Sequence, residues 1–189
     1  QQAHGWLNDL IGQRVRLLNR QHAMSHRAKP SAFVVGQMAA QLRQLNERID
    51  ECERHLEVLV KKSFAELYER LLTIPSIGAK TALELIIVTD GFTRFEDVKQ
   101  LGAYIGVSPT TLRSGSSVRG KGSIAKLGQG RMRQLLYLCA WTAKRCNPAC
   151  KQLHQRLKAQ GKPAKVINIA LAHKLLRQAH AVATKNVRF

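Results

Sequence analysis

The chain of 189 residues is strongly basic, because 31 Lys and Arg stand against 12 Asp and Glu and give a formal net charge of +19. Its longest purely apolar run, Leu85-Ile86-Ile87-Val88, is far too short to cross a bilayer, so we expect no membrane partner. Four cysteines without framework spacing favour a reducing cytoplasm, and a hydrophobic content of 44% suits one or two soluble domains with modest cores. This composition argues against a secreted disulfide scaffold and against an integral membrane protein.

The basic charge is confined to one part of the sequence. All 12 acidic residues lie at or before Asp97 together with 13 basic ones, whereas 18 basic and no acidic residues follow Asp97, so the two parts carry +1 and +18. A surface of one sign repels itself unless phosphates neutralise it, and the counterions that phosphates release drive binding. We therefore expect nucleic acid to be the partner of the C-terminal part.

Almost the whole chain has a helical pattern, which predicts a mainly α fold. The chain begins Gln1-Gln2 rather than with methionine, and we expect it to be a piece of a longer protein. Residues 1–29 are predicted to form a short basic linker helix, residues 30–72 a long coiled-coil helix that begins after the break at Pro30, and residues 73–189 a compact helical domain. The apolar face of the first helix is expected to consist of Trp6, Leu10, Val15 and Leu18.

A narrow apolar seam runs along the second predicted helix. It steps by 4, 3, 4, 3, 4 and 3 positions through Met38, Leu42, Leu45, Ile49, Cys52, Leu56 and Leu59. These steps keep one stripe in register for three heptads, and such a narrow stripe requires a partner helix. A coiled coil between protomers, giving a homodimer or homotetramer, is the favoured interpretation, and an intramolecular helical hairpin is the alternative.

A turn rich in Pro and Gly, residues 73–78, separates this helix from a second one expected over Thr81–Thr89. The pattern resembles a helix-hairpin-helix, in which backbone N–H groups at a helix N-terminus hold a DNA phosphate, and Lys80 is placed to assist. A purely structural turn between helices would need the same Pro and Gly. A further short helix is expected over Val98–Ile105.

Helical periodicity is lost between Gly106 and Gly130, and this long glycine- and serine-rich loop is predicted to hold no regular structure. Loops of that length in compact domains are usually functional or disordered. We expect a phosphate to sit among the cations of this region and of the helix that follows near Gln129. They are Arg113, Arg119, Lys121, Lys126, Arg131 and Arg133. A basic loop that merely touches a nucleic-acid backbone is the alternative.

Cys146, Cys150 and His154 recur at four-residue steps, as zinc ligands can, but Pro148 lies between the cysteines and no fourth ligand matches. We therefore expect them to pack, and we expect no cofactor to bind this chain.

Two more helices are predicted towards the C-terminus. Tyr137 and Trp141 lie on a helix expected over 132–145, where a buried aromatic core is favoured over a base-stacking platform. The last helix, over 163–184, has apolar residues at helical spacing and is expected to close the domain. Its two histidines, His173 and His180, are interpreted as structural rather than catalytic.

An ordered succession of motifs between residues 70 and 176 resembles the C-terminal domain of the IS-one-ten class of insertion-sequence transposases, to which the pilin-gene invertases are related. The motifs are Leu71-x-x-Ile74-Pro75-x-Ile77-Gly78-x-x-Thr81-Ala82, Phe95, Tyr104-Ile105-Gly106-Val107-x-Pro109, Ser114-Gly115 and Ile124-x-Lys126-x-Gly128-x-x-x-Met132-Arg133-x-x-Leu136-Tyr137. The helices before them resemble the coiled-coil linker of that family. The chain departs from the family pattern at Ala125, where relatives more often have a serine.

The resemblance implies a DNA recombinase of cytoplasmic, nucleoid-associated prokaryotic origin. Ser114 would attack a DNA phosphodiester and hold the strand as a phosphoserine, while a bridging non-coding RNA selects the DNA sites. A RuvC-like domain upstream would bind Mg²⁺ through four carboxylates, so this chain alone is expected to be inactive.

The site expected from the residues and the resemblance together has Ser114 as nucleophile, with Ser116 and Ser117 as local competitors. The expected phosphate-binding residues are Arg113, Gly115, Arg119, Lys121, Lys126, Arg131, Arg133 and Lys80. A non-catalytic helix-hairpin-helix module that clamps DNA or RNA is the alternative function.

Overall fold

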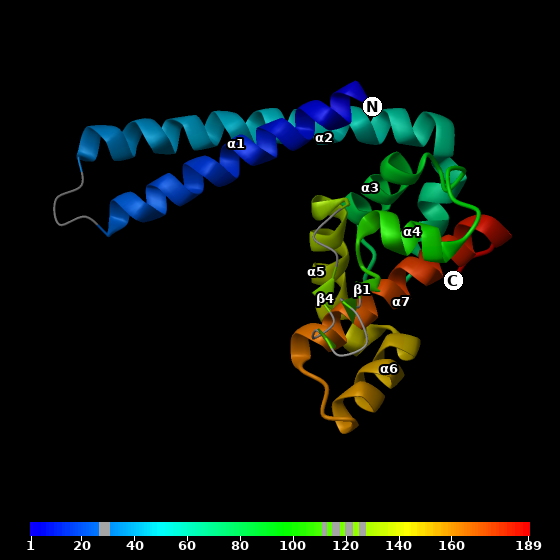
Figure 1. Ribbon diagram of the computed structural model, residues 1–189. Helices are drawn as coiled ribbons and strands as arrows, with labels where there is room; N and C mark the ends of the chain where they lie inside the picture. The colour runs from blue at the N-terminus through cyan, green and yellow to red at the C-terminus, as the bar shows by residue number, and fades with distance from the viewer. Residues whose placement is uncertain (27–30, 111–112, 115–117, 120–122, 125–127) are drawn as a thin grey trace. The chain divides into compact units, whose positions relative to one another are not determined.

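The computed structural model describes residues 1–26, 31–110, 113–114, 118–119, 123–124 and 128–189, and over 109–127 only the backbone pairing of the strands is described. Within these residues the chain forms seven α-helices and four two-residue strands, so the predicted mainly α fold is confirmed (Figure 1). The helices are α1 (Gln2–Ser25), α2 (Ala32–Leu72), α3 (Ala79–Thr89), α4 (Val98–Ile105), α5 (Gly130–Cys146), α6 (Pro148–Ala159) and α7 (Ala164–Lys185). The chain divides into two compact units, residues 1–63 and 64–189. Among the described residues, every helix is too short or too polar to span a membrane.

The first unit is a hairpin of α1 and the first part of α2. Cys52 Sγ donates to the carbonyl oxygen of Ala3 at 3.4 Å, and Arg14 Nη1 donates to Asn46 Oδ1 at 3.4 Å. The later residue of α1 thus contacts the earlier residue of α2, so the two helices run antiparallel (Figure 1). The apolar seam of α2 therefore packs on α1 of the same chain, which is the intramolecular hairpin that the sequence analysis gave as the alternative. A coiled coil between protomers stays a prediction.

The seam of α2 is buried in its middle and shifts at its end. Leu45, Ile49 and Leu56 are buried, but Leu59 is 46% exposed and the neighbouring Val60 is 5% exposed. The predicted last step of the seam is therefore wrong by one residue. A step of four from Leu56 keeps Val60 on the same side of the helix as Leu45, Ile49 and Leu56.

The first helix differs from its prediction in the face that it buries. It spans 24 residues, Gln2–Ser25, within the range 1–29 expected for it. Trp6, Val15 and Leu18 are each about half exposed. The buried residues of this helix are Leu7, Leu10 and Leu17, which lie three and seven positions apart. The helix has apolar residues on two sides, and composition alone did not distinguish the side that meets α2.

The division between the two units along the chain coincides with a break in α2. Phe64 has φ −136° and ψ 32°, which interrupts the helix, and the turn after α3 places Gly91 at φ +64° beside it. A Cβ at Gly91 would collide with the Phe64 ring, so the close approach requires glycine. Beyond the break Tyr68 and Leu71 are buried in the second unit. The boundary between the two compact units therefore lies within α2, before this helix ends.

The second unit packs α5, α6 and α7 against one another, with α3 and α4 on their flank. Its largest fully buried side chains include Leu71, Ile74, Leu85, Ile86, Leu101, Ile105, Met132, Leu136 and Leu171. The helices expected near 81–89, 98–105, 132–145 and 163–184 are all present with small changes at their ends. The last of them closes this core, as expected, through Ile167, Leu171, Leu175 and Ala179.

The sequence interpretation missed α6. Pro148 interrupted the pattern, yet here it occupies the first turn, where its missing N–H costs nothing. Asn147 caps this helix by accepting a hydrogen bond from the backbone N–H of Cys150 at 3.2 Å. The proline therefore begins a helix rather than preventing one.

Candidate nucleic-acid site

Residues 107–128, here named the serine segment, contain two short antiparallel ladders. Strand β1 (Pro109–Thr110) pairs with β4 (Ser123–Ile124), and between them β2 (Arg113–Ser114) pairs with β3 (Val118–Arg119). The prediction that this stretch holds no regular structure is therefore wrong, because two-residue pairs need only local backbone hydrogen bonds and no side-chain periodicity. The register sets Arg113 opposite Arg119 and Ser114 opposite Val118.

Several of the predicted site residues cannot be placed. Gly115, Lys121 and Lys126 lie outside the described residues, as do the competitors Ser116 and Ser117. Of Arg113, Ser114 and Arg119 only the backbone register is described.

Both ends of the serine segment are fixed to the helical core. Val107 is buried at its start. At its end Gly128 has φ +97° and packs so closely on the carbonyl of Tyr104 that a Cβ would collide with it. Gln129 Nε2 then donates to the Tyr104 hydroxyl at 3.0 Å, directly before α5 begins. The segment therefore leaves and rejoins the core beside α4, at the N-terminus of α5.

Two predicted phosphate ligands on the first turn of α5 already have protein partners. Arg131 Nε lies 3.2 Å from Glu84 Oε2, and the side chain of Glu84 is only 4% exposed. Arg133 Nη1 donates to the carbonyl oxygen of Ile105 at 3.0 Å. These contacts join α5 to α3 and to the end of α4. Sequence analysis overlooked Glu84, although a single acid within the apolar run of α3 was a signal of a buried partner.

Lys80 lies exposed on the first turn of α3, as the helix-hairpin-helix interpretation requires. The N-cap of this helix is Gly78, and no side chain caps it. Beside it, Thr81 Oγ1 lies 3.3 Å from the sulfur of Cys139 on α5. Burial raises the pKa of the Cys139 thiol, against the lowering effect of hydrogen bonds from Thr81 and the Gly78 backbone. Part of the polar surface of this N-terminus is therefore covered by a neutral thiol.

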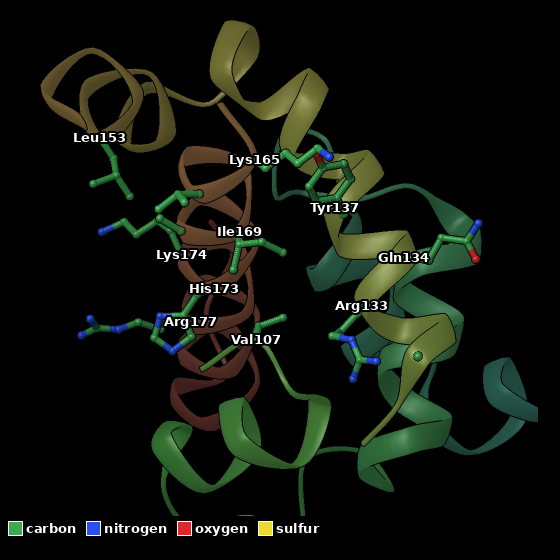
Figure 2. A pocket seen from close by; sticks show the side chains of 13 residues that line it. Val107, Arg133, Gln134, Tyr137, Leu153, Lys165, Ile169, His173, Lys174 and Arg177 are labelled. Carbon is green, nitrogen blue, oxygen red and sulfur yellow. The ribbon is translucent and has the colours of Figure 1, made fainter. Parts of the chain in front are cut away.

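A cavity of about 890 Å³, here named the α5–α7 cavity, opens between α5 and α7 (Figure 2). Its apolar wall consists of Val107, Tyr137, Leu153, Val166, Ile169 and Ala170. Its basic wall consists of Arg133, Lys165, His173, Lys174 and Arg177. No Asp or Glu is found among the described residues that line it. Because Val107 and Gly130 also line it, the cavity lies where the serine segment leaves and rejoins the core.

His173 lies in the wall of this cavity in its neutral form near pH 7. Burial, and secondarily the positive charge of Arg177, lowers the pKa of His173 below its ordinary value. Gly102 on α4 makes room for this ring, because a Cβ there would lie 3.2 Å from His173 Nε2 and 2.9 Å from Ser108 Oγ. The structural interpretation of His173 is thus incomplete, since the ring lines a cavity as well as packing on α4.

The predicted aromatic core on α5 is wrong for Trp141. Its side chain is 50% exposed, and Lys144 Nζ lies 4.3 Å from the ring centroid. Leu138, one turn earlier, is 57% exposed. Tyr137 is half-buried, and its hydroxyl accepts a hydrogen bond from Asn168 Nδ2 at 3.4 Å.

The expected packing of the cysteines near the end of α5 holds for Cys150 but not for Cys146. Cys150 is buried and Cys146 is exposed. Burial raises the pKa of Cys150 to about 11, so its thiol is neutral at physiological pH. Within the described ranges no three His, Cys, Asp or Glu side chains gather as metal ligands would.

Comparison with known proteins relates the second unit to transposases. Residues 68–155 match the model of the transposase IS116/IS110/IS902 family. A pilin gene-inverting protein of Moraxella lacunata is 35% identical over 120 residues, which cover 63% of this chain and 37% of that protein. A transposase for insertion sequence element IS1328 of Yersinia enterocolitica is 32% identical over 148 residues, covering 77% and 43%. An uncharacterized 43.6 kDa protein of insertion element IS110 from Streptomyces coelicolor is 27% identical over 130 residues, covering 69% and 31%.

These matches confirm the similarity to IS110-class transposases that the motifs indicated. The chain spans less than half the length of the relatives it matches. The family match includes Ser114, the first turn of α5 with Arg133, and Leu153 of α6, whereas α7 with Lys165, His173, Lys174 and Arg177 of the cavity lies beyond it.

Proposed function

We propose that this chain is part of a DNA transposase or site-specific recombinase and that its second unit supplies the serine nucleophile. The observation that carries the proposal is the match of residues 68–155 to the transposase family, a range that contains Ser114. The charge distribution supports it, because every residue after Asp97 that is charged at neutral pH is basic. A domain of that kind binds a polyanion through released counterions.

In the proposed reaction the Ser114 oxygen forms a bond to a DNA phosphorus, and the bond from that phosphorus to one deoxyribose oxygen breaks. The hydroxyl proton leaves the serine, and a proton is taken up by the departing deoxyribose oxygen, so no oxidant or reductant is needed. Such a step requires positive charge around the phosphate. The strand register supports this, because it pairs Arg113 with Arg119 and so brings two basic residues into the strands that contain Ser114.

The remaining parts of the proposed recombinase come from outside this chain. We propose that a RuvC-like domain of the full protein holds Mg²⁺ with four carboxylates and that a bridging RNA selects the DNA sites. Oligomerisation through the α1–α2 hairpin would bring several serine domains to one DNA junction, as exchange of several strands requires. These elements rest on the family resemblance.

A non-catalytic helix-hairpin-helix module is the second candidate function. It is favoured by Lys80, which is exposed on the first turn of α3, and by the N-cap residue Gly78, which has no side chain with which to cap the helix. In that case this unit would hold the nucleic-acid backbone and the chemistry would belong to another domain.

Substitution of Ser114 in the full-length protein separates the two functions. With a nicked substrate that traps the covalent intermediate, the wild type is expected to give a protein–DNA adduct on denaturing gels. Ser114→Ala should abolish the adduct and leave DNA binding within about twofold, because the variant removes one neutral hydroxyl. Ser116→Ala and Ser117→Ala are the matched controls and should retain the adduct. Adduct formation by Ser114→Ala would favour the non-catalytic module.

A further inference from the structure

We propose that the α5–α7 cavity receives one unpaired nucleotide, with its base against the apolar wall and its phosphate at the basic wall. The proposal rests on the proposed function only in taking nucleic acid as the ligand. The proposal adds that the second unit distinguishes an unpaired base from a paired one. Four of the five basic residues that line the cavity lie on α7.

The size of the cavity suits a single nucleotide of a nucleic-acid strand. A volume of about 890 Å³ lies within the range of pockets that enclose small ligands. A base in a duplex is stacked and paired, so both of its faces are covered and it cannot enter a pocket without leaving the helix. An unpaired or flipped nucleotide has already left the stack.

The apolar wall suits the flat face of a base. Ile169 on α7 and Tyr137 on α5 lie on opposite sides of the cavity (Figure 2), and Ala170 on α7 also lines it. The hydrogen bond from the buried Asn168 to the Tyr137 hydroxyl fixes the ring before any ligand arrives. A ring that is already fixed loses little freedom when a base packs beside it.

The basic wall suits the phosphate. His173 and Arg177 are one helical turn apart on α7, and Lys174 lies one turn after Ala170, so apolar and basic side chains follow one another along the same side of the helix. With no carboxylate among the described lining residues, a cationic ligand is disfavoured and an anionic one favoured. A nucleotide combines the apolar face and the anionic group at the required close spacing.

An acidic peptide helix is the competing occupant, because it also combines apolar and anionic groups. The nucleotide is favoured by the position of the cavity. Val107 and Gly130 place it where the serine segment leaves and rejoins the core, so a nucleotide next to a phosphate held at that segment reaches it without crossing the protein.

The test compares two duplexes of one length, one perfectly paired and one with a single bulged 2-aminopurine nucleotide. Binding to residues 1–189 is measured by anisotropy of an end label, and 2-aminopurine fluorescence reports the environment of the bulged base. The wild type should bind the bulged duplex at least about fivefold more tightly, the lower end of the effect of one stacked base. Equal affinity for the two duplexes would refute the proposal.

Two variants connect that preference to the cavity. Ala170→Phe places an aromatic ring inside the cavity and should abolish the preference while leaving affinity for the paired duplex unchanged, whereas Ala159→Phe, at the exposed end of α6, should change neither. Tyr137→Leu removes the aromatic ring with little loss of apolar volume and serves if Ala170→Phe does not fold. If the folded variants retain the wild-type preference, the base binds elsewhere.

A charge-matched pair tests the phosphate. Lys174→Gln with Arg177→Gln should weaken binding of the bulged duplex more than Lys158→Gln with Lys162→Gln, which removes two charges outside the cavity. Equal losses would show that only overall charge matters and would refute the phosphate assignment.

The remaining outcomes separate the proposals. Failure to bind either duplex at low salt would contradict the proposed function itself. Displacement of 2-aminopurine DNA by an oligoglutamate peptide with apolar residues, at concentrations where oligoglutamate alone has no effect, would assign the cavity to an acidic protein segment and overturn the nucleotide proposal.

Discussion

The ion pair between Glu84 and Arg131 joins α3 to the first turn of α5, and its removal should destabilise the second unit. Glu84→Ala leaves the Arg131 guanidinium, whose side chain is 20% exposed, without its carboxylate partner. Removing one partner of a buried pair is more damaging than replacing both, because the remaining charge stays desolvated. The variant also opens a small void in an apolar helix.

The geometry gives the magnitude. Two unit charges 3.2 Å apart attract by about 5 kcal/mol at an effective dielectric constant of about 20. The cost of burying Glu84 offsets much of this attraction, and the exposed fraction of Arg131 lets water take over part of the lost interaction. We therefore expect Glu84→Ala to lower the free energy of unfolding by about 2 to 4 kcal/mol.

Urea unfolding followed by tryptophan fluorescence provides the assay. The chain has two tryptophans, and in a Trp6→Phe background the signal comes from Trp141 in the second unit alone. The expected loss should lower the unfolding midpoint by about 1 to 2 M urea. Glu66→Gln is the matched control, since Glu66 pairs with Arg70 but is 89% exposed, and it should cost about 0.5 kcal/mol or less. A loss for Glu84→Ala no larger than for this control would refute the reasoning.

Three further predictions follow from charge, exposure and pKa. Affinity for duplex DNA should fall about tenfold or more between 50 and 200 mM salt, because several phosphates displace counterions from a part of the chain that carries +18, and a flat salt dependence measured by anisotropy would contradict a polyanion partner. Leu59, which is 46% exposed on the hairpin, should lie between protomers, so Leu59→Lys should lower the mass seen by light scattering; a monomeric wild type would limit the seam to one chain. Because the pKa of His173 is lowered in the free protein, the unfolded chain takes up a proton at this ring more readily than the folded protein does. The free energy of unfolding should therefore fall as pH falls below about 6.5. A phosphate bound beside the ring should instead favour protonation of His173. DNA binding should therefore tighten between pH 7.5 and about 5.5 more for wild type than for His173→Gln, and identical pH profiles would exclude His173 from the binding site.

Secondary structure was predictable wherever local chemistry decides it. The bounds of α4 follow from Asp97, whose side chain accepts from the Lys99 backbone at 3.0 Å, and from Gly106, which ends the helix at φ +81°. Both are residue types that favour those positions. Pro148 shows the limit, because a proline before a helix and a proline that breaks one look alike in sequence.

The serine segment was identified from its motifs, but its ladders were not. A pair of two residues such as β2 and β3 leaves no alternation of apolar and polar positions to detect. The α5–α7 cavity was also missed, because Val107, Tyr137 and Ile169 come from three elements that only the packing of the helices brings together. Nothing in the local sequence of α7 distinguishes Lys174 from a solvent-exposed lysine.

The charge segregation does not make every basic residue after Asp97 a ligand for nucleic acid. Arg131 is next to the acid-free serine segment, yet its charge is neutralised by Glu84 from α3. Lys174 has no carboxylate partner among the described residues and lines the cavity. Slopes of the logarithm of affinity against the logarithm of salt distinguish these roles, because each lost phosphate contact lowers the slope by about 0.9. Lys174→Gln should reduce the slope by nearly that amount. Arg131→Gln should lower stability but leave the slope of the folded protein close to wild type, and a reduced slope would mean that Arg131 leaves Glu84 to hold a phosphate.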